Sequence, residues 1–194
     1  SVRAILDQVQ RMGHTIDELL LFAKPKDASS SFRPCRLSAL IASLRETFLL
    51  RCEAKGVRLE TSLEYEGTLW GCPPQVYRVL ENLVKNALDA VGERGEILIA
   101  SERMKGEEVV IRVADSGSGV PDSIRGSLFE PFVTRDKPGG TGLGLAIVKK
   151  IVCEQGGRVW EEPWNLKGAC FHLALPLCPP GTEDVPAAVS LGGQ

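Results

Sequence analysis

Two glycine-rich segments carry the residues that are best suited to binding a ligand. The first, residues 115–119 (DSGSG), follows a predicted strand, and the second, residues 139–145 (GGTGLGL), opens a predicted helix. Gly117 and Gly119 allow the backbone to approach a flat ligand closely, and the Asp115 carboxylate can accept a hydrogen bond from an exocyclic amine such as that of adenine. Neither segment matches the phosphate-loop or the dinucleotide-binding pattern. Taken alone, each is as well explained as a turn or a helix start.

The second segment suits an anion such as a polyphosphate. A helix start brings unpaired backbone N–H groups and the positive end of the helix dipole to one place. Lys137 precedes this helix, and its ammonium group can add a point charge on a terminal phosphate. Arg135 is the alternative cation.

Two asparagines on a predicted helix form a third element. Asn82 and Asn86 are one turn apart, so both project from one face, and they fall beside Leu83 and Ala87 on the side expected to be buried. A neutral amide oxygen is a suitable magnesium ligand when phosphates already supply the negative charge. Solvation of both side chains at the surface is the alternative.

The elements that must position these residues alternate between helix and strand patterns. Helices are predicted over residues 38–55, 73–91 and 141–155. Ser38 is expected to cap the first helix and Gly56 to end it. Strands are predicted over residues 32–37, 57–63, 96–102, 108–114, 158–162 and 170–175. This order predicts an α+β fold, a two-layer α/β sandwich with a mixed sheet and helices on one face, rather than a doubly wound nucleotide fold.

A long helix is predicted before this domain. Apolar residues recur at heptad spacing from Val2 to Ala23, which favours pairing with another helix, and an amphipathic helix lying on the domain is the alternative. Pro25 ends the helix. The predicted organisation is a helix, a globular domain and a disordered tail, over residues 1–27, 28–178 and 179–194.

Composition restricts the class of protein. The chain has 194 residues, 43% hydrophobic and 25% charged, with a formal net charge of −2, so no nucleic acid partner is expected. No apolar run approaches the roughly 18 residues of a membrane span, and we expect no secretory leader. The six cysteines contain no C-x-x-C pair and there are two histidines. A cytoplasmic protein with reduced thiols, and without a zinc site, is the better interpretation.

Four motifs in order resemble those of sensor histidine kinases. Residues 82–87 (NLVKNA) resemble the N box, residues 115–119 the G1 box, residues 129–132 (FEPF) the F box and residues 140–145 (GTGLGL) the G2 box. Each motif is weak alone, but four in the family's order are specific. The resemblance extends over about residues 30–176.

This resemblance implies the Bergerat ATP-binding fold, with ATP and Mg²⁺ as ligands. Asp115 would accept the hydrogen bond of the adenine amine, and Asn86 would coordinate the magnesium ion that bridges the phosphates. Residues 120–140 would form a lid, anchored by Phe129 and Phe132. The other nucleotide contacts would come from Asn82, Ala90, Gly117, Gly119, Val120, Lys137, Gly140, Thr141, Gly142, Leu143 and Gly144. Positioning and the metal ion would carry the phosphoryl transfer.

Two departures from related patterns matter. Relatives of this fold that hydrolyse ATP, such as type II topoisomerases, mismatch-repair proteins and heat-shock chaperones, carry a glutamate where this chain has Asn82, which cannot act as a general base. Glu81 lies about 100° around the helix, so transfer to a protein acceptor is favoured over hydrolysis. Relatives also usually have threonine or serine where this chain has Ala169, so one polar contact near the adenine is expected to be lost.

The phosphoacceptor histidine is not identified in the chain. His14 is followed by threonine and isoleucine rather than by an acidic residue, and residues 17–25 resemble the second helix of the dimerisation hairpin, whose first helix carries the acceptor. His172 alternates within a predicted strand and is expected to be structural. We therefore expect a fragment that begins after the acceptor helix and contains no catalytic residue of its own.

The leading prediction is the ATP-binding core of a protein-histidine kinase. It would transfer the γ-phosphate of ATP to a histidine on the helical hairpin, for relay to an aspartate of a response-regulator receiver domain. The intact protein would be a homodimer, and its attachment to a membrane is left open. Two alternatives remain. One is a serine kinase that inactivates an anti-sigma antagonist, which the helix before Pro25 argues against; the other is a nucleotide-binding scaffold that transfers nothing.

Overall fold

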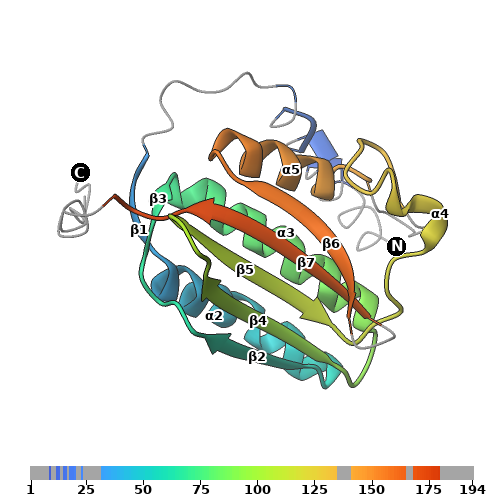
Figure 1. The fold of residues 1–194 in the computed structure, drawn as a ribbon. Helices are drawn as coiled ribbons and strands as arrows, with labels where there is room; N and C mark the ends of the chain where they lie inside the picture. Colours follow the sequence, from blue (N-terminus) through green and yellow to red (C-terminus); the bar gives the residue numbers. More distant parts are fainter. Residues whose placement is uncertain are drawn as a thin grey trace, which may run out of the picture.

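A five-stranded mixed sheet forms the centre of the protein (Figure 1). The computed structural model describes residues 9, 12–13, 15–16, 18–20, 23, 32–134, 141–164 and 168–179. In spatial order the strands are β2 (Arg58–Leu63), β4 (Glu96–Arg103), β5 (Glu108–Asp115), β7 (Gly168–Pro176) and β6 (Arg158–Trp164). β2 and β4 pair in parallel, and the other neighbours are antiparallel. The prediction of a mixed sheet is confirmed.

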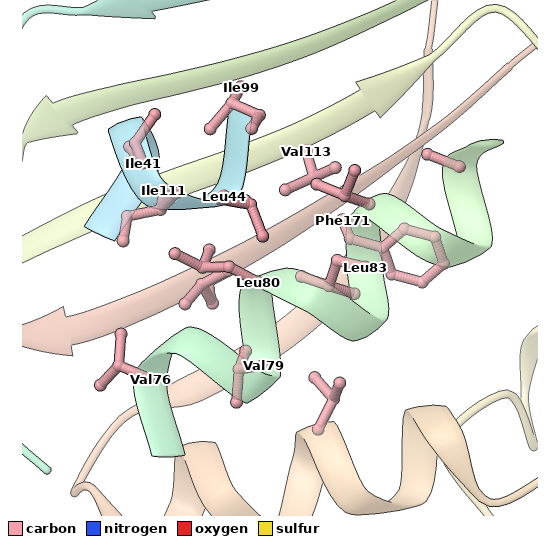
Figure 2. Packing of buried hydrophobic residues seen from close by; sticks show 14 of the residues in the cluster. Ile41, Leu44, Val76, Val79, Leu80, Leu83, Ile99, Ile111, Val113 and Phe171 are labelled. Carbon is pink, nitrogen blue, oxygen red and sulfur yellow. The ribbon is translucent and has the colours of Figure 1, made fainter. Parts of the chain in front are cut away.

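Three helices cover one face of this sheet (Figure 1). They are α2 (Leu37–Lys55), α3 (Pro73–Val91) and α5 (Gly144–Glu154). Figure 2 shows the apolar side of α3, where Leu80 and Leu83 meet Ile111 and Val113 of β5 in one continuous core. Full burial of a leucine contributes about 1.5–3 kcal/mol to folding. The predicted two-layer sandwich is therefore confirmed.

Two short elements are not apparent in the sequence pattern. β3 (Thr68–Gly71) pairs antiparallel with β1 (Arg33–Arg36), and α4 (Asp122–Arg125) follows β5. β1, β3 and α4 are each four residues long. An element of this length shows almost no periodicity, so only tertiary pairing reveals it.

Ser38 does not cap α2, which corrects the prediction. The helix begins at Leu37 and no side chain caps it. The backbone N–H of Leu37 instead donates to the carbonyl of Gly67 at 3.0 Å, so a distant loop satisfies a donor that Ser38 was expected to help satisfy. The predicted end is correct, because Gly56 adopts the left-handed conformation with φ 63°.

The described residues between 9 and 23, which we call the N-terminal helix, are all helical. Their heptad positions face solvent: Val9, Met12 and Ile16 are 52–59% exposed. This exposure contradicts the alternative in which the helix lies on the domain by its apolar side. Pairing with a second helix stays a prediction. Within the described part of the chain, no helix is both long and apolar enough to cross a membrane.

Candidate functional site

A cavity of about 800 Å³ lies where α3, the end of β5 and the start of α5 meet. Nine of the predicted contact residues, which belong to or adjoin three of the four sequence motifs, line it: Asn82, Asn86, Ala90, Asp115, Gly119, Val120, Thr141, Gly142 and Gly144. No residue of the motif at 129–132 is in this lining. Four predicted contacts are not in this lining. Gly117 and Leu143 are described elsewhere in the fold, whereas Lys137 and Gly140 lie outside the described residues. His14 also lies outside them.

Asp115 is a buried carboxylate at the inner end of the cavity. It is the last residue of β5, it is 2% exposed, and its Oδ1 accepts a hydrogen bond from the backbone N–H of Gly117 at 2.8 Å. A side chain at Gly168 would meet the Asp115 carbonyl at 1.6 Å, which shows how closely β7 approaches at this point. The carboxylate is therefore held in one orientation by the sheet and by its own turn.

Gly117 packs closely on the end of α3. A Cβ atom there would lie 2.6 Å from the carbonyl oxygen of Ala90. The glycine therefore allows the turn to approach α3, and its contact with a ligand stays a prediction. Gly119, with φ 69°, is the glycine of this turn that lines the cavity.

Asn82 and Asn86 both face the cavity from α3. The Asn82 Nδ2 donates to the carbonyl of Arg78 at 3.0 Å, and its Oδ1 lies 3.4 Å from the position that a Cβ of Gly144 would take. The amide oxygen is therefore directed towards the start of α5. Both asparagines are half-buried and line the cavity, rather than being exposed on the outer surface of the helix.

The donor set fits a metal ion that arrives with phosphates. The described residues contain no group of three or more His, Cys, Asp or Glu side chains that could hold a metal ion. The oxygens offered by Asn82 and Asn86 are neutral, and Mg²⁺ normally keeps several ligands from water and phosphate. The cavity therefore suits a magnesium–nucleotide complex better than a permanent metal centre.

The turn before α5 explains why that helix begins at Gly144 rather than at Thr141 as predicted. Gly142 has φ 69°, which is not helical, and a Cβ there would lie 2.6 Å from the backbone of Phe132. The N–H of Phe132 donates to the Gly142 carbonyl at 3.0 Å, and the Thr141 hydroxyl accepts from the N–H of Leu143 at 3.3 Å. Leu143 itself is a core residue, 1% exposed.

A short wall after β5 closes one side of the cavity. Val120, Pro121 and Ile124 line it. Arg125 holds this wall, because its Nη2 donates to the Val120 carbonyl at 3.0 Å and its Nε lies 3.4 Å from a carboxylate oxygen of Glu161 on β6. Burial raises the pKa of Glu161, although Arg125 opposes that shift.

Some lining residues fall outside the sequence motifs. Lys55 and Asp89 belong to helices whose polar residues are expected to be solvated. Ala169, which the resemblance placed near the adenine, lines the cavity from the start of β7. Glu18 is the most distant of them, and comes from the N-terminal helix. Its burial at 4% exposure has no signal in the heptad pattern, which concerns only the apolar positions.

His172 lies on the sheet face opposite the cavity. Side chains alternate along a strand, and Phe171 is the neighbour that lines the cavity. The His172 ring is stacked on Trp160, with centroids 5.1 Å apart, and burial lowers its pKa. This environment favours the expected structural role over that of a phosphoacceptor.

Comparison with known proteins places the cavity in a characterised family of domains. Residues 71–179 match the family model described as histidine kinase-, DNA gyrase B-, and HSP90-like ATPase. The alginate biosynthesis sensor protein KinB of Pseudomonas aeruginosa is 33% identical over 180 residues, which cover 91% of this chain and 30% of KinB. The chain thus spans less than a third of this relative's length.

Two solved structures resemble the fold. The catalytic domain of the histidine kinase ThkA is 33% identical, with a TM-score of 0.70, over 76% of this chain and 96% of that one. The histidine kinase ThkA in complex with the response regulator protein TrrA is 28% identical, with a TM-score of 0.77, over 92% of this chain and 51% of that one. The likeness therefore covers almost the whole of a solved kinase catalytic domain.

Proposed function

Because the chain belongs to the histidine kinase-, DNA gyrase B- and HSP90-like ATPases and contains the ATP-binding catalytic domain of a sensor histidine kinase, we propose that its cavity holds Mg²⁺·ATP for transfer of the γ-phosphate to a histidine. The observation that carries this proposal is the convergence of Asn86, Asp115 and Thr141 on one cavity, from three separate segments. Each segment alone is a weak motif, but their meeting supports one ligand that touches all three.

Different residues contact different parts of the proposed ligand. Asp115, buried and oriented by the Gly117 N–H, accepts the hydrogen bond of the adenine amine. Gly119 and Val120 lie against the base, and the turn at Thr141 together with the N-terminus of α5 receives the phosphates. Asn86, with Asn82 one turn away, would hold the magnesium ion, which would neutralise part of the charge of the phosphates.

Transfer to a protein acceptor is favoured over transfer to water. Asn82 has no basic oxygen, and its amide is tethered to the Arg78 carbonyl. Glu81 is not among the cavity-lining residues. The site therefore lacks a carboxylate at the position where hydrolytic relatives of this fold carry their glutamate.

The acceptor and the later partner follow from the same family. We propose a histidine on a helical hairpin as the acceptor and a response-regulator receiver domain as the next partner, which the ThkA–TrrA complex supports. Residues 1–27 would be the second helix of that hairpin and residues 28–178 the catalytic domain, with a homodimer formed through the exposed heptad positions Val9, Met12 and Ile16. All six cysteines are free, which supports a cytoplasmic location.

Two measurements test the proposal. Calorimetry with Mg²⁺ and ATP is expected to show binding by the parent chain, loss of that binding in Asp115→Ala, and no change in Glu46→Ala, which removes an acidic side chain from an exposed position of α2 away from the cavity. Labelled ATP mixed with a histidine-bearing hairpin from a sensor kinase is then expected to label the hairpin. Absence of binding by the parent chain would overturn the nucleotide site. Binding without labelling would favour the scaffold, and labelling of a serine would favour the anti-sigma type of kinase.

A further inference from the structure

Glu18 is an acidic side chain buried at the nucleotide cavity. It lies on the N-terminal helix, where its neighbours Leu19 and Leu20 are 41% and 58% exposed, yet Glu18 itself is 4% exposed and lines the cavity. The helix thus turns an acidic residue inwards and leaves apolar ones in solvent, which is the reverse of the usual preference. A buried carboxylate requires a specific hydrogen-bonding partner.

One such partner belongs to the turn proposed to receive the phosphates. The Thr141 hydroxyl donates to the Glu18 Oε2 at 2.5 Å, although the two residues are 123 positions apart. The same hydroxyl accepts the N–H of Leu143 at 3.3 Å. Glu18 therefore contacts the phosphate end of the cavity through the residue that shapes its turn.

We propose that Glu18 is a specificity-determining residue of the nucleotide site, whose carboxylate competes with the nucleotide's phosphates for the Thr141 turn. The inference rests on the proposed binding of ATP in this cavity. A threonine hydroxyl has one proton, so it cannot donate to the carboxylate and to a phosphate oxygen together. Like charges also repel more strongly in a partly buried site than in water. The discrimination is directed against the ligand with the most phosphate charge.

The competition links the N-terminal helix to the nucleotide. If contact of Glu18 with Thr141 lowers the affinity for ATP, bound ATP must weaken that contact by the same factor. Binding of a triphosphate then releases the helix at Glu18, whereas a nucleoside without phosphates leaves it in place. The contact between the N-terminal helix and the Thr141 turn therefore depends on whether the bound ligand carries phosphates.

The central experiment compares ligands of increasing charge on the full chain. Dissociation constants of adenosine, ADP and ATP are measured with Mg²⁺ and with EDTA, for the parent and for Glu18→Gln, which keeps the side-chain size. We expect ATP to bind about tenfold more tightly to the variant, within the usual range of coupling between sites, ADP to show a smaller gain, and adenosine to be unchanged. Glu46→Gln removes the same charge from an exposed position of α2 and is the matched control.

The outcomes separate this inference from the function on which it rests. ATP affinity that is equal in Glu18→Gln and Glu46→Gln, or weaker in Glu18→Gln because the carboxylate assists the magnesium ion, would overturn the role of Glu18 and leave the nucleotide site intact. Failure of the parent and both variants to bind any of the three ligands would overturn the site itself, and the role of Glu18 with it.

A second measurement does not depend on affinity. Hydrogen exchange at the amides of Leu19 and Leu20 is expected to become faster when ATP, but not adenosine, is added to the parent chain. In Glu18→Gln, which removes the charge but keeps an oxygen acceptor for Thr141, exchange at the same amides is expected to change less when ATP is added. Protection that is unchanged by ATP in the parent would contradict the competition, even if the affinities differ.

Discussion

The two ends of the cavity are built in different ways. At the inner end, Asp115 closes a central strand of the sheet opposite Ile97 and is 2% exposed. At the other end, Thr141 and Gly142 belong to a turn that is held by the Phe132 backbone and by Glu18 from a distant helix. The site proposed for the base is therefore part of the folded core, whereas the site proposed for the phosphates depends on a few contacts between separate segments.

This difference shows where the affinity for a nucleotide can be adjusted. Packing around Asp115 is shared with the core, so a change there disturbs the fold together with the site. The Thr141 turn is held by a few contacts between separate segments, so a change there is expected to alter phosphate binding more than binding of the base. Substitutions of one glycine at each end test this contrast directly.

The largest effect is expected for Gly117→Ala at the inner end. The added Cβ would lie 2.6 Å from the carbonyl oxygen of Ala90, and relief requires movement of the turn away from α3. We expect a loss of about 1–3 kcal/mol in the free energy of unfolding and at least tenfold weaker binding of both ATP and adenosine. Chemical denaturation and calorimetry measure the two effects.

Gly126→Ala is the matched control for this substitution. At Gly126 the φ angle is −66° and an added Cβ meets nothing within 4 Å. The stability of Gly126→Ala and its affinities for ATP and adenosine should stay at the parent values. If Gly117→Ala also keeps parent affinity for adenosine, the close packing of this turn does not determine the base site, and the contrast between the two ends fails.

Gly142→Ala should produce a more selective effect on ligand binding. At this position φ is 69° and a Cβ would lie 2.6 Å from the Phe132 backbone, a left-handed conformation that costs a non-glycine residue about 1–3 kcal/mol. We expect ATP to bind about tenfold more weakly, because the turn moves, and adenosine to keep its affinity within about twofold. Equal weakening for both ligands would show that the two ends are not independent.

The sequence was informative where local pattern decides the structure. The predicted helix 73–91 agrees with α3 (Pro73–Val91), because a proline pair and a wide apolar face are both local features. The strand preceding Asp115 was found for the same reason. The family motifs then predicted that Asn86 and Asp115 share one cavity, as they do.

Long-range contacts explain what the sequence did not reveal. Ser38 is an ordinary capping residue by type, but the helix start is satisfied from Gly67 across the fold. The close approach of Gly117 to Ala90 is a contact with another element that the glycine motif alone does not predict. Glu18 joins the cavity only because the N-terminal helix lies against the Thr141 turn. None of these pairings has a period or a motif, so no local pattern predicts them.

The smallest predicted effect concerns the contact between Glu161 and Arg125 at the side of the cavity. The side chain of Glu161 is 3% exposed, and both of its oxygens and the Arg125 Nε are buried without a hydrogen bond. Burial raises the pKa of Glu161, so the folded state holds this proton at pH values where the unfolded chain has lost it. Linkage then requires the free energy of unfolding to fall as pH rises from the ordinary glutamate pKa through the raised one.

Glu161→Gln removes that titration while keeping an oxygen for Arg125, so the variant is expected to lack this fall. Below about pH 4 the parent glutamate is largely protonated in both states, and the two proteins should differ little in their pH dependence. Above the raised pKa the variant should have gained stability relative to the parent. Urea denaturation at several pH values between about 4 and 8 measures the difference, and Glu93→Gln, at an exposed position, is the control. If the variant instead loses stability relative to the parent as pH rises, the ionised Glu161 stabilises the segment that Arg125 holds. This side of the cavity would then depend on an ion pair.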